Sequence, residues 1–232
     1  MIAYLSHKYH ITKRADCQVD YQVYLKKIKK DNVAAATNAA CELLQEKGIE
    51  NVKMTDVARK ANLGVASMYR YFETKEKLII TCAVKMWEKV IESIMPAFCT
   101  SEYSTLCGFE KIKRILSVYK TLFDEHKDFV RFVARFDSYC LNNSIETDKL
   151  ADYEKLFSLL YEYFSEAFDL GITDGSIRAD VDRRVFYLTC NHALMAVVQK
   201  LVSGEILAQD NFADSTEIDI MIDIFMSYIK AA

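Results

Sequence analysis

Residues 40–78 carry the clearest structural signal in the chain and read ACELLQEKGIENVKMTDVARKANLGVASMYRYFETKEKL. Apolar residues recur at helical spacing from Val33 to Leu44, and Gly48 supplies the left-handed residue that commonly ends a helix. Thr55 can cap a second helix, the sequence Asn62-Leu63-Gly64 can break it, and a third short helix then runs to Phe72. The pattern predicts a three-helix unit within residues 31–78.

The third of these helices has two distinct faces. Met68 and Phe72 lie one turn apart and are expected to point inward, which turns Ala66 and Arg70 outward. Two short helices joined by a tight turn behind a longer helix form a helix-turn-helix, whose last helix can enter the major groove of DNA. An ordinary helical hairpin is the alternative, but the small, polar and cationic outer face favours DNA binding.

The same stretch resembles the DNA-binding signature of the tetracycline-repressor (TetR) family. The matching elements are the pair Gly48-Ile49, the sequence Thr55-Asp56-Val57-Ala58 and the block MYRYFETKEKL at residues 68–78. The match covers about a sixth of the chain. This chain has Gly64-Val65-Ala66 where the family often has Ser-Lys-Gly at the start of the recognition helix. The operator preference of relatives therefore does not carry over.

The expected contacts with DNA divide into phosphate and base contacts. Thr55 offers a hydroxyl and free backbone N–H groups near a helix start, and the Arg70 guanidinium can bind guanine O6 and N7 together. Tyr71 is equally interpretable as a core aromatic, and Arg70 as a solvated surface residue. The predicted DNA-binding residues are Thr55, Val65, Ala66, Ser67, Tyr69, Arg70, Tyr71 and Lys75.

Charge is distributed unevenly along the chain. The net charge is −3, yet residues 1–80 carry fourteen Lys and Arg against nine Asp and Glu, while the remainder carries sixteen against twenty-four. A basic front on an acidic body is typical of nucleic-acid binding by the front alone. Residues 1–30 are interpreted as an N-terminal extension that ends in a lysine cluster. An upstream start codon or a basic arm would each explain it.

Residues 79–232 are expected to form a larger helical domain. One Pro and six Gly leave few breaks, so the fold class is all-α with about nine helices. Interruptions are expected near Pro96–Gly108, His126, Asn142–Asp148, Gly171–Gly175 and Gly204–Asn211. The sequence Asp174–Asp182 also resembles the turn that many TetR members place before their last two helices.

Aromatic residues recur at helical spacing through this body, a pattern that plain core packing also produces. The family resemblance implies a pocket among these helices, and the composition favours a small apolar or aromatic effector. Asn191 is a further candidate anchor, and His192 is equally interpretable as a core residue. The predicted ligand-binding residues are Tyr119, Phe123, Phe136, Tyr139, Tyr161, Phe164, His192 and Met195.

The last two helices, at about 183–203 and 216–230, carry wide apolar stripes. By resemblance they pair with their twofold copies, so a homodimer would present two recognition helices to a palindromic operator on double-stranded DNA. A monomer with both helices packed inside is the alternative. The predicted interface consists of Leu188, Met195, Val198, Val202, Ile218, Met221, Ile222, Phe225 and Ile229.

Other classes of protein fit less well. The sequence has no nucleophile elbow, phosphate loop, zinc-protease or Rossmann motif, so no catalytic residues and no cofactor are expected. Seven dispersed Cys are interpreted as reduced core thiols, and His7 and His10 alone do not complete a metal site. No charge-free apolar run reaches the length of a membrane span, and no secretion signal is apparent, which favours a cytoplasmic protein without membrane contact. A purely structural helical adaptor is the remaining alternative.

Overall fold

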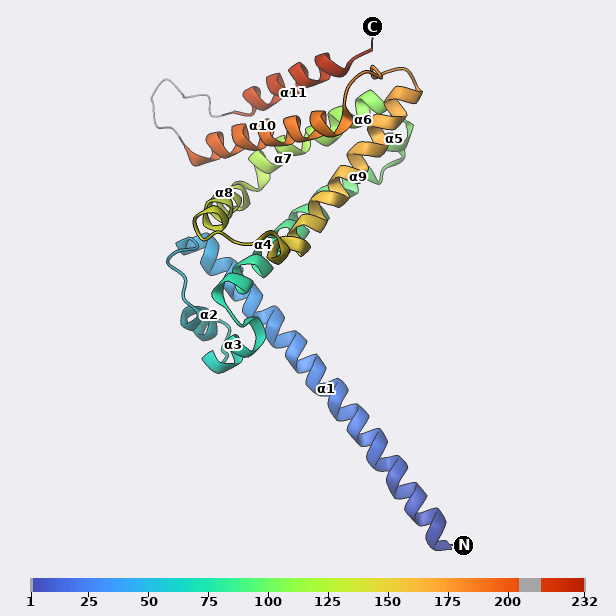
Figure 1. The fold of residues 1–232 in the computed structure, drawn as a ribbon, viewed down its shortest axis with the longest axis vertical. Coiled ribbons are helices and arrows are strands. Elements are labelled where there is room, and N and C mark those ends of the chain that lie inside the picture. The colour runs from blue at the N-terminus through green and yellow to red at the C-terminus, as the bar shows by residue number, and fades with distance from the viewer. Residues whose placement is uncertain (1, 205–213, 232) are drawn as a thin grey trace.

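The computed structural model describes residues 2–204 and 214–231, with side chains from Tyr21 onward. Within these residues the fold is all helical apart from one isolated β-bridge, as expected (Figure 1). The expected interruption near 204–211 lies almost wholly outside the described residues. The α-helices are α1 (Ile2–Lys47), α2 (Met54–Lys60), α3 (Val65–Phe72), α4 (Lys75–Ile94), α5 (Ser101–Thr105), α6 (Gly108–Leu116), α7 (Val118–Glu125), α8 (Lys127–Asn142), α9 (Ala151–Thr173), α10 (Arg183–Ser203) and α11 (Thr216–Ile229). Two 3-10 helices cover Met95–Phe98 and Thr147–Leu150.

Helices α1 to α3 form the expected three-helix unit. Ala36 and Leu44 of α1 are buried together with Val57 of α2 and Met68 of α3. Gly48 has a φ of +78° and ends α1, as its position in the sequence predicted. The apolar spacing therefore identified the inner faces of α1 and α3 correctly.

The start of α2 differs from expectation. The helix begins at Met54 with Lys53 as its cap residue, and Thr55 is the second helical residue. The backbone N–H of Lys53 donates to the Asp56 carboxylate at 3.3 Å, so the side chain that reaches back to the start of the helix is that of Asp56. Thr55 remains exposed.

Helix α1 is much longer than expected. It begins at Ile2 and so runs through the segment that the sequence analysis interpreted as an N-terminal extension. This stretch has no apolar periodicity, but it also has neither Pro nor Gly from Ile2 to Lys47 to end a helix. The N-terminal half of α1 extends past α2 and α3, away from the body (Figure 1).

Helices α4 to α11 form the body. α4 packs on α1 at one end of the molecule and on α9 further along, while α10 and α11 lie side by side across the far end (Figure 1). By length and composition α10 could cross a membrane, which the stricter charge-free criterion did not detect. In this fold α10 packs against α7, α8, α9 and α11, and much of its apolar surface is exposed.

The turn after α9 joins three parts of the body. The Asp174 carboxylate accepts from the backbone N–H of Gly108 at 2.7 Å and from that of Ser176 at 2.9 Å. Ile177 forms a β-bridge with Lys230 after α11. Asp182 then caps α10 by accepting from the Val185 N–H at 2.9 Å. The turn at residues 174–182 therefore lies directly before the last two helices, as the resemblance implied.

Candidate DNA interface and effector cavity

Helix α3 presents the outer face that the sequence predicted. Met68 and Phe72 are buried where α3 packs on α2 and α4, whereas Ala66 and Arg70 are exposed. Val65 and Tyr69 also expose 40% and 51% of their surface, which is unusual for large apolar side chains. An exposed face of small, aromatic and cationic side chains on a short helix fits the major groove of DNA.

Arg70 lies at the centre of this face and is held by weak local contacts. Its guanidinium donates to the Ser67 hydroxyl at 3.3 Å and to the Tyr71 hydroxyl at 3.4 Å, and its side chain is solvent-exposed. Tyr71 is half-buried, and its hydroxyl also accepts from the Asn32 amide of α1 at 3.2 Å. These hydrogen bonds, first from Asn32 and then from Arg70, lower the pKa of the Tyr71 phenol. Tyr71 thus ties α3 to α1 and also accepts a long hydrogen bond from the exposed Arg70 side chain.

The remaining DNA-site candidates surround α3. Thr55 is exposed near the start of α2, and Ser67 is half-buried beside Arg70. Lys75 opens α4, and its ammonium donates to the backbone carbonyl of Glu50 at 3.4 Å. Because an ammonium has three N–H groups, Lys75 keeps donors for a phosphate.

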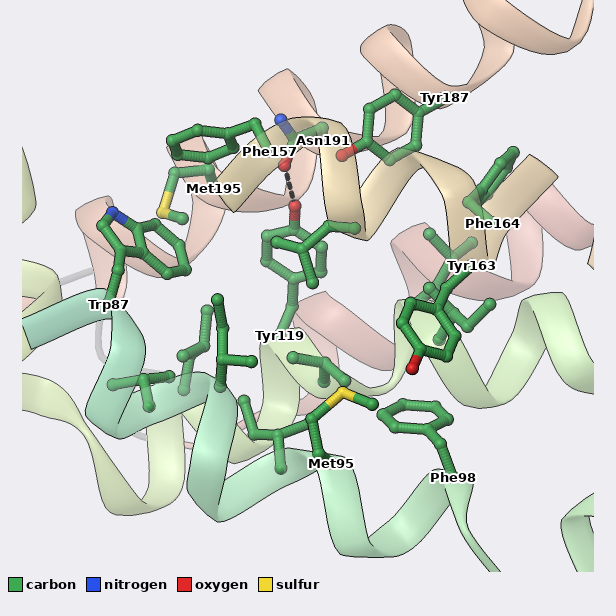
Figure 2. A pocket seen from close by; sticks show the side chains of 18 residues that line it. Trp87, Met95, Phe98, Tyr119, Phe157, Tyr163, Phe164, Tyr187, Asn191 and Met195 are labelled. Carbon is green, nitrogen blue, oxygen red and sulfur yellow. Dashed lines mark hydrogen bonds between the residues drawn. The ribbon is translucent and has the colours of Figure 1, made fainter. Parts of the chain in front are cut away.

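A cavity of about 90 Å³ lies between α4, α6, α7, α9 and α10 (Figure 2). Its wall is apolar and aromatic, and none of its lining side chains is charged. The lining residues are Trp87, Val90, Ile91, Ile94, Met95, Phe98, Ile115, Leu116, Val118, Tyr119, Leu122, Phe157, Leu160, Tyr163, Phe164, Tyr187, Asn191 and Met195.

The polar groups of the cavity are few. The Tyr119 hydroxyl donates to the Asn191 side-chain oxygen, and the Tyr187 hydroxyl lies on the same side (Figure 2). Burial raises the pKa of Tyr119, so its hydroxyl stays a neutral donor. Trp87 donates to Tyr153 at 2.9 Å, which fixes the indole at one end of the cavity. The site can therefore bind a neutral molecule with one or two hydrogen-bonding groups.

A family model for the tetR family of bacterial regulatory proteins matches residues 36–82. An HTH-type transcriptional regulator of Staphylococcus aureus strain MRSA252 is 22% identical over 176 residues, which cover 75% of this chain and 90% of the relative. Residues 36–82 are therefore a DNA-binding domain of the tetR family, and the chain is a DNA-binding transcriptional regulator. The expectation of a DNA-binding regulator rather than an enzyme is confirmed.

Solved structures of regulators share the fold of this chain. A transcriptional regulator from Saccharomonospora viridis in complex with choline aligns with a TM-score of 0.68 at 11% identity, over 88% of this chain and 99% of that one. FadR from Bacillus subtilis in complex with stearoyl-CoA aligns with a TM-score of 0.61 at 15% identity, over 84% and 98%. At such low identity the likeness concerns the fold.

The predicted ligand residues of the regulator are only partly brought together. Tyr119, Phe164 and Met195 line the cavity, as does Asn191, which was a further candidate. Phe123, Phe136 and Tyr139 are buried elsewhere in the core, Tyr161 packs on Tyr187 outside the cavity, and His192 is exposed. These five residues lie in the core or on the outer face of a helix and do not line the cavity.

The predicted ligand-binding residues included none from α4. Trp87, Val90, Ile91 and Ile94 form one wall of the cavity, and Met95 and Phe98 of the following 3-10 helix extend it. The signal was present, because the apolar stripe of α4 continues to Ile94, four turns beyond the helix-turn-helix. The helix that begins beside the DNA-binding unit thus ends in the cavity wall.

The predicted dimer residues are mostly internal to the protomer. Val198, Val202, Ile218, Ile222 and Ile229 are buried in the core, and Met195, Met221 and Phe225 are half-buried. Only Leu188 lies on the exposed face. The large apolar side chains exposed on α10 and α11 are instead Val185, Leu188, Ile220, Ile224 and Tyr228.

Proposed function

We propose that this regulator is a repressor that binds a palindromic operator as a homodimer and is released by a small, neutral, apolar or aromatic effector. The observation that carries the proposal is α4, which begins at Lys75 beside α3 and forms a wall of the charge-free cavity with Trp87, Val90, Ile91 and Ile94. A displacement of this wall would tilt the recognition helix. DNA is the target, so we further propose that the protein acts in the cytoplasm.

The small volume of the cavity supports a mechanism in which a bound effector expands it. At about 90 Å³ it is smaller than the roughly 150 Å³ cavity that holds benzene and far smaller than typical drug-sized sites of about 300–1,000 Å³. An effector larger than a few atoms must therefore push the lining helices apart. Met95 has a flexible side chain at the rim of the cavity and offers one way to open it (Figure 2). Filling the cavity would favour a dimer in which the distance between the two recognition helices no longer matches the operator.

Related folds bind ligands of different chemistry, choline in one case and stearoyl-CoA in another. The wall of the present cavity has no carboxylate for a cation and no Lys or Arg for an acidic group. Aromatic rings such as those of Trp87 and Phe157 can still attract a cation through their faces. The absence of charge favours a neutral effector.

We expect neutral aromatic compounds to raise the melting temperature of the DNA-free protein and to weaken operator binding by about 5- to 150-fold, the usual range of allosteric coupling. Replacing Leu160 with Trp should fill the cavity and abolish this stabilisation. The matched control is Leu159→Trp, which places the same ring at a neighbouring, exposed position. Thermal shift and operator titration measure both effects. Equal stabilisation of the two variants would place the effector elsewhere.

The base contact of α3 gives a second expected result. Arg70→Ala should cost roughly 1–3 kcal/mol and relax preference at one position in each half-site, while Lys75→Ala should weaken all sequences alike and flatten the salt dependence. Arg131→Ala, an exposed Arg on α8 paired with Asp128, serves as the control. Titrations against the operator and its single-base variants distinguish these outcomes. The proposed interface would be contradicted if the Arg70→Ala and Lys75→Ala proteins both bound the operator as the wild type does.

The exposed apolar face of α10 and α11 supports the homodimer. Ile220 and Ile224 expose 55% and 56% of their surface, and a groove lined by Val185, Phe225 and Tyr228 runs between the two helices. A contiguous apolar face with a groove can receive the same face of a second copy through a twofold axis. The proposed interface is therefore this outer face in place of the predicted buried stripe.

A further inference from the structure

Residues 21–31 of α1 form a stretch of helix that the described part of the fold leaves uncovered. Every residue from Tyr21 to Asp31 is exposed. Residues 2–31 span about 45 Å at the α-helical rise, which exceeds the roughly 34 Å of one turn of DNA. The helix leaves the molecule at the end that carries α2 and α3 (Figure 1). A duplex bound on α3 would have this helix beside it.

The positive charge of the DNA-binding end resides in this extension. Residues 1–30 contain seven Lys and Arg against two Asp, whereas residues 31–80 contain seven Lys and Arg against seven Asp and Glu. The helix-turn-helix segment itself is thus formally neutral. The entire excess of five positive charges in the first 80 residues precedes it.

Intramolecular pairing weakens the cations of the helix-turn-helix further. Arg59 pairs with Asp56 at 2.9 Å, Lys60 with Glu42 at 2.9 Å, and Lys77 with Glu73 at 3.0 Å. In contrast, no carboxylate among the residues with described side chains forms an ion pair with the four lysines at 26, 27, 29 and 30. Lysines without such partners keep their charge available for phosphates.

The lysine cluster directly adjoins the recognition helix. Asn32, two residues after Lys30, donates to the Tyr71 hydroxyl of α3 at 3.2 Å. Lys29 lies close enough to this phenol to contribute, after the Asn32 and Arg70 hydrogen bonds, to its lowered pKa. A phosphate beside the groove read by α3 would therefore be near the first turn of the lysine cluster.

We propose that the N-terminal half of α1 is a phosphate-binding arm that contacts the DNA backbone beside the half-site read by α3. Lys26, Lys27, Lys29 and Lys30 supply the charge, and the rigid helix fixes their distance from α3. The same segment carries a short apolar stripe of Tyr21, Tyr24 and Ile28, which could pack on a second copy or a membrane. Charge and position beside α3 favour DNA. The inference rests on the DNA binding of the regulator and does not depend on the effector.

The test replaces Lys26, Lys27, Lys29 and Lys30 with Gln in the full-length protein and measures operator affinity at several salt concentrations. Each phosphate contact contributes about 0.9 to the slope of log affinity against log salt, so we expect the slope to become shallower by about 2–4 for each of the two arms of the proposed dimer. Affinity at physiological salt should fall on the order of 10- to 100-fold, with the preferred sequence unchanged. Arg at the same four positions should restore the wild-type salt slope and operator affinity.

Two control variants separate the arm from its alternatives. Gln at Lys89, Lys111, Lys127 and Lys155 removes the same charge from the body and should leave the slope nearly unchanged. Ser at Tyr21, Tyr24 and Ile28 removes the apolar stripe and should leave operator affinity and oligomeric state unchanged. The proposal is wrong if the lysine variant binds operator with the wild-type slope, or if only the stripe variant changes binding, oligomeric state or retention on anionic vesicles. Arg70→Ala distinguishes a failed arm from a failed α3 interface, because it alters sequence preference and leaves the salt slope largely intact.

Discussion

Replacing Ile220 and Ile224 with Glu is expected to convert the regulator into a monomer and to reduce operator affinity by more than about 100-fold. Both residues lie on the exposed face of α11, so the isolated protomer accommodates Glu there. In a twofold interface the two substitutions bury four carboxylates without partners, which is strongly unfavourable. A monomer also contacts only one half of a palindromic operator.

Sedimentation and operator titration measure this effect. The control is Glu at Leu141 and Leu159, two exposed Leu residues on α8 and α9, where the same change should leave the dimer intact. Glu at Ile229 would be a poor test, because Ile229 is fully buried within the protomer and its loss would disturb the fold. A wild-type protein that is monomeric at micromolar concentration, or a double variant that remains dimeric, would refute the proposed interface.

Gly108→Ala is expected to destabilise the fold by about 3 kcal/mol or more, at the upper end of overpacking effects. A Cβ at Gly108 would lie 2.0 Å from the backbone nitrogen of Gly171 and 2.6 Å from the carbonyl oxygen of Ala167. Backbone atoms of a packed helix cannot move aside as a side chain can, so α6 would have to separate from α9. A loss of this size corresponds to a fall in melting temperature of roughly 6–12 °C in a chain of this length.

Gly64→Ala is the matched control for this change, since a Cβ there meets no atom within 4 Å. Gly64 has a φ of −69°, which Ala adopts without strain. Thermal unfolding of the two variants should therefore differ clearly. A Gly108→Ala protein that melts at the wild-type temperature would show that α6 and α9 do not approach as closely as described.

Local signals in the sequence predicted the helix-turn-helix well. Gly48 and Asn62 both adopt positive φ where breaks were expected, and Met68 and Phe72 point inward as the spacing required. These features depend on residues within one or two turns of each other. The start of α2 was wrong by two residues because Thr55 was taken as the cap residue, whereas Lys53 holds that place and Asp56 accepts from its backbone N–H as the third helical residue.

Features that depend on distant segments were predicted less well. α10 and α11 are apolar on more than one face, so periodicity could not tell whether Ile222 or Ile224 points into the protomer. The cavity joins residues as far apart as Trp87 and Met195, and Phe136 satisfies the same local pattern as Phe164 without reaching it. Gly108 marks a helix break as expected, because α6 begins there, but its close contact with α9 was not predicted.

The helical extension of α1 was missed for a different reason. Sequence periodicity detects a helix through the face that it buries, and residues 21–31 bury none. The absence of Pro and Gly was the only local indication of a helix there. The charge asymmetry was noticed, but it was assigned to the first 80 residues as a whole.

Selection of bound sequences from random duplex DNA, carried out in parallel with the wild-type regulator and with Arg70→Ala, tests most directly whether a pair of α3 helices reads a palindromic operator. We expect the wild type to enrich an inverted repeat, with half-sites placed for two successive recognition helices. The Arg70→Ala variant should enrich the same repeat with preference lost at one base pair in each half-site. An enriched site without twofold symmetry, or identical base preferences for both proteins, would contradict this account.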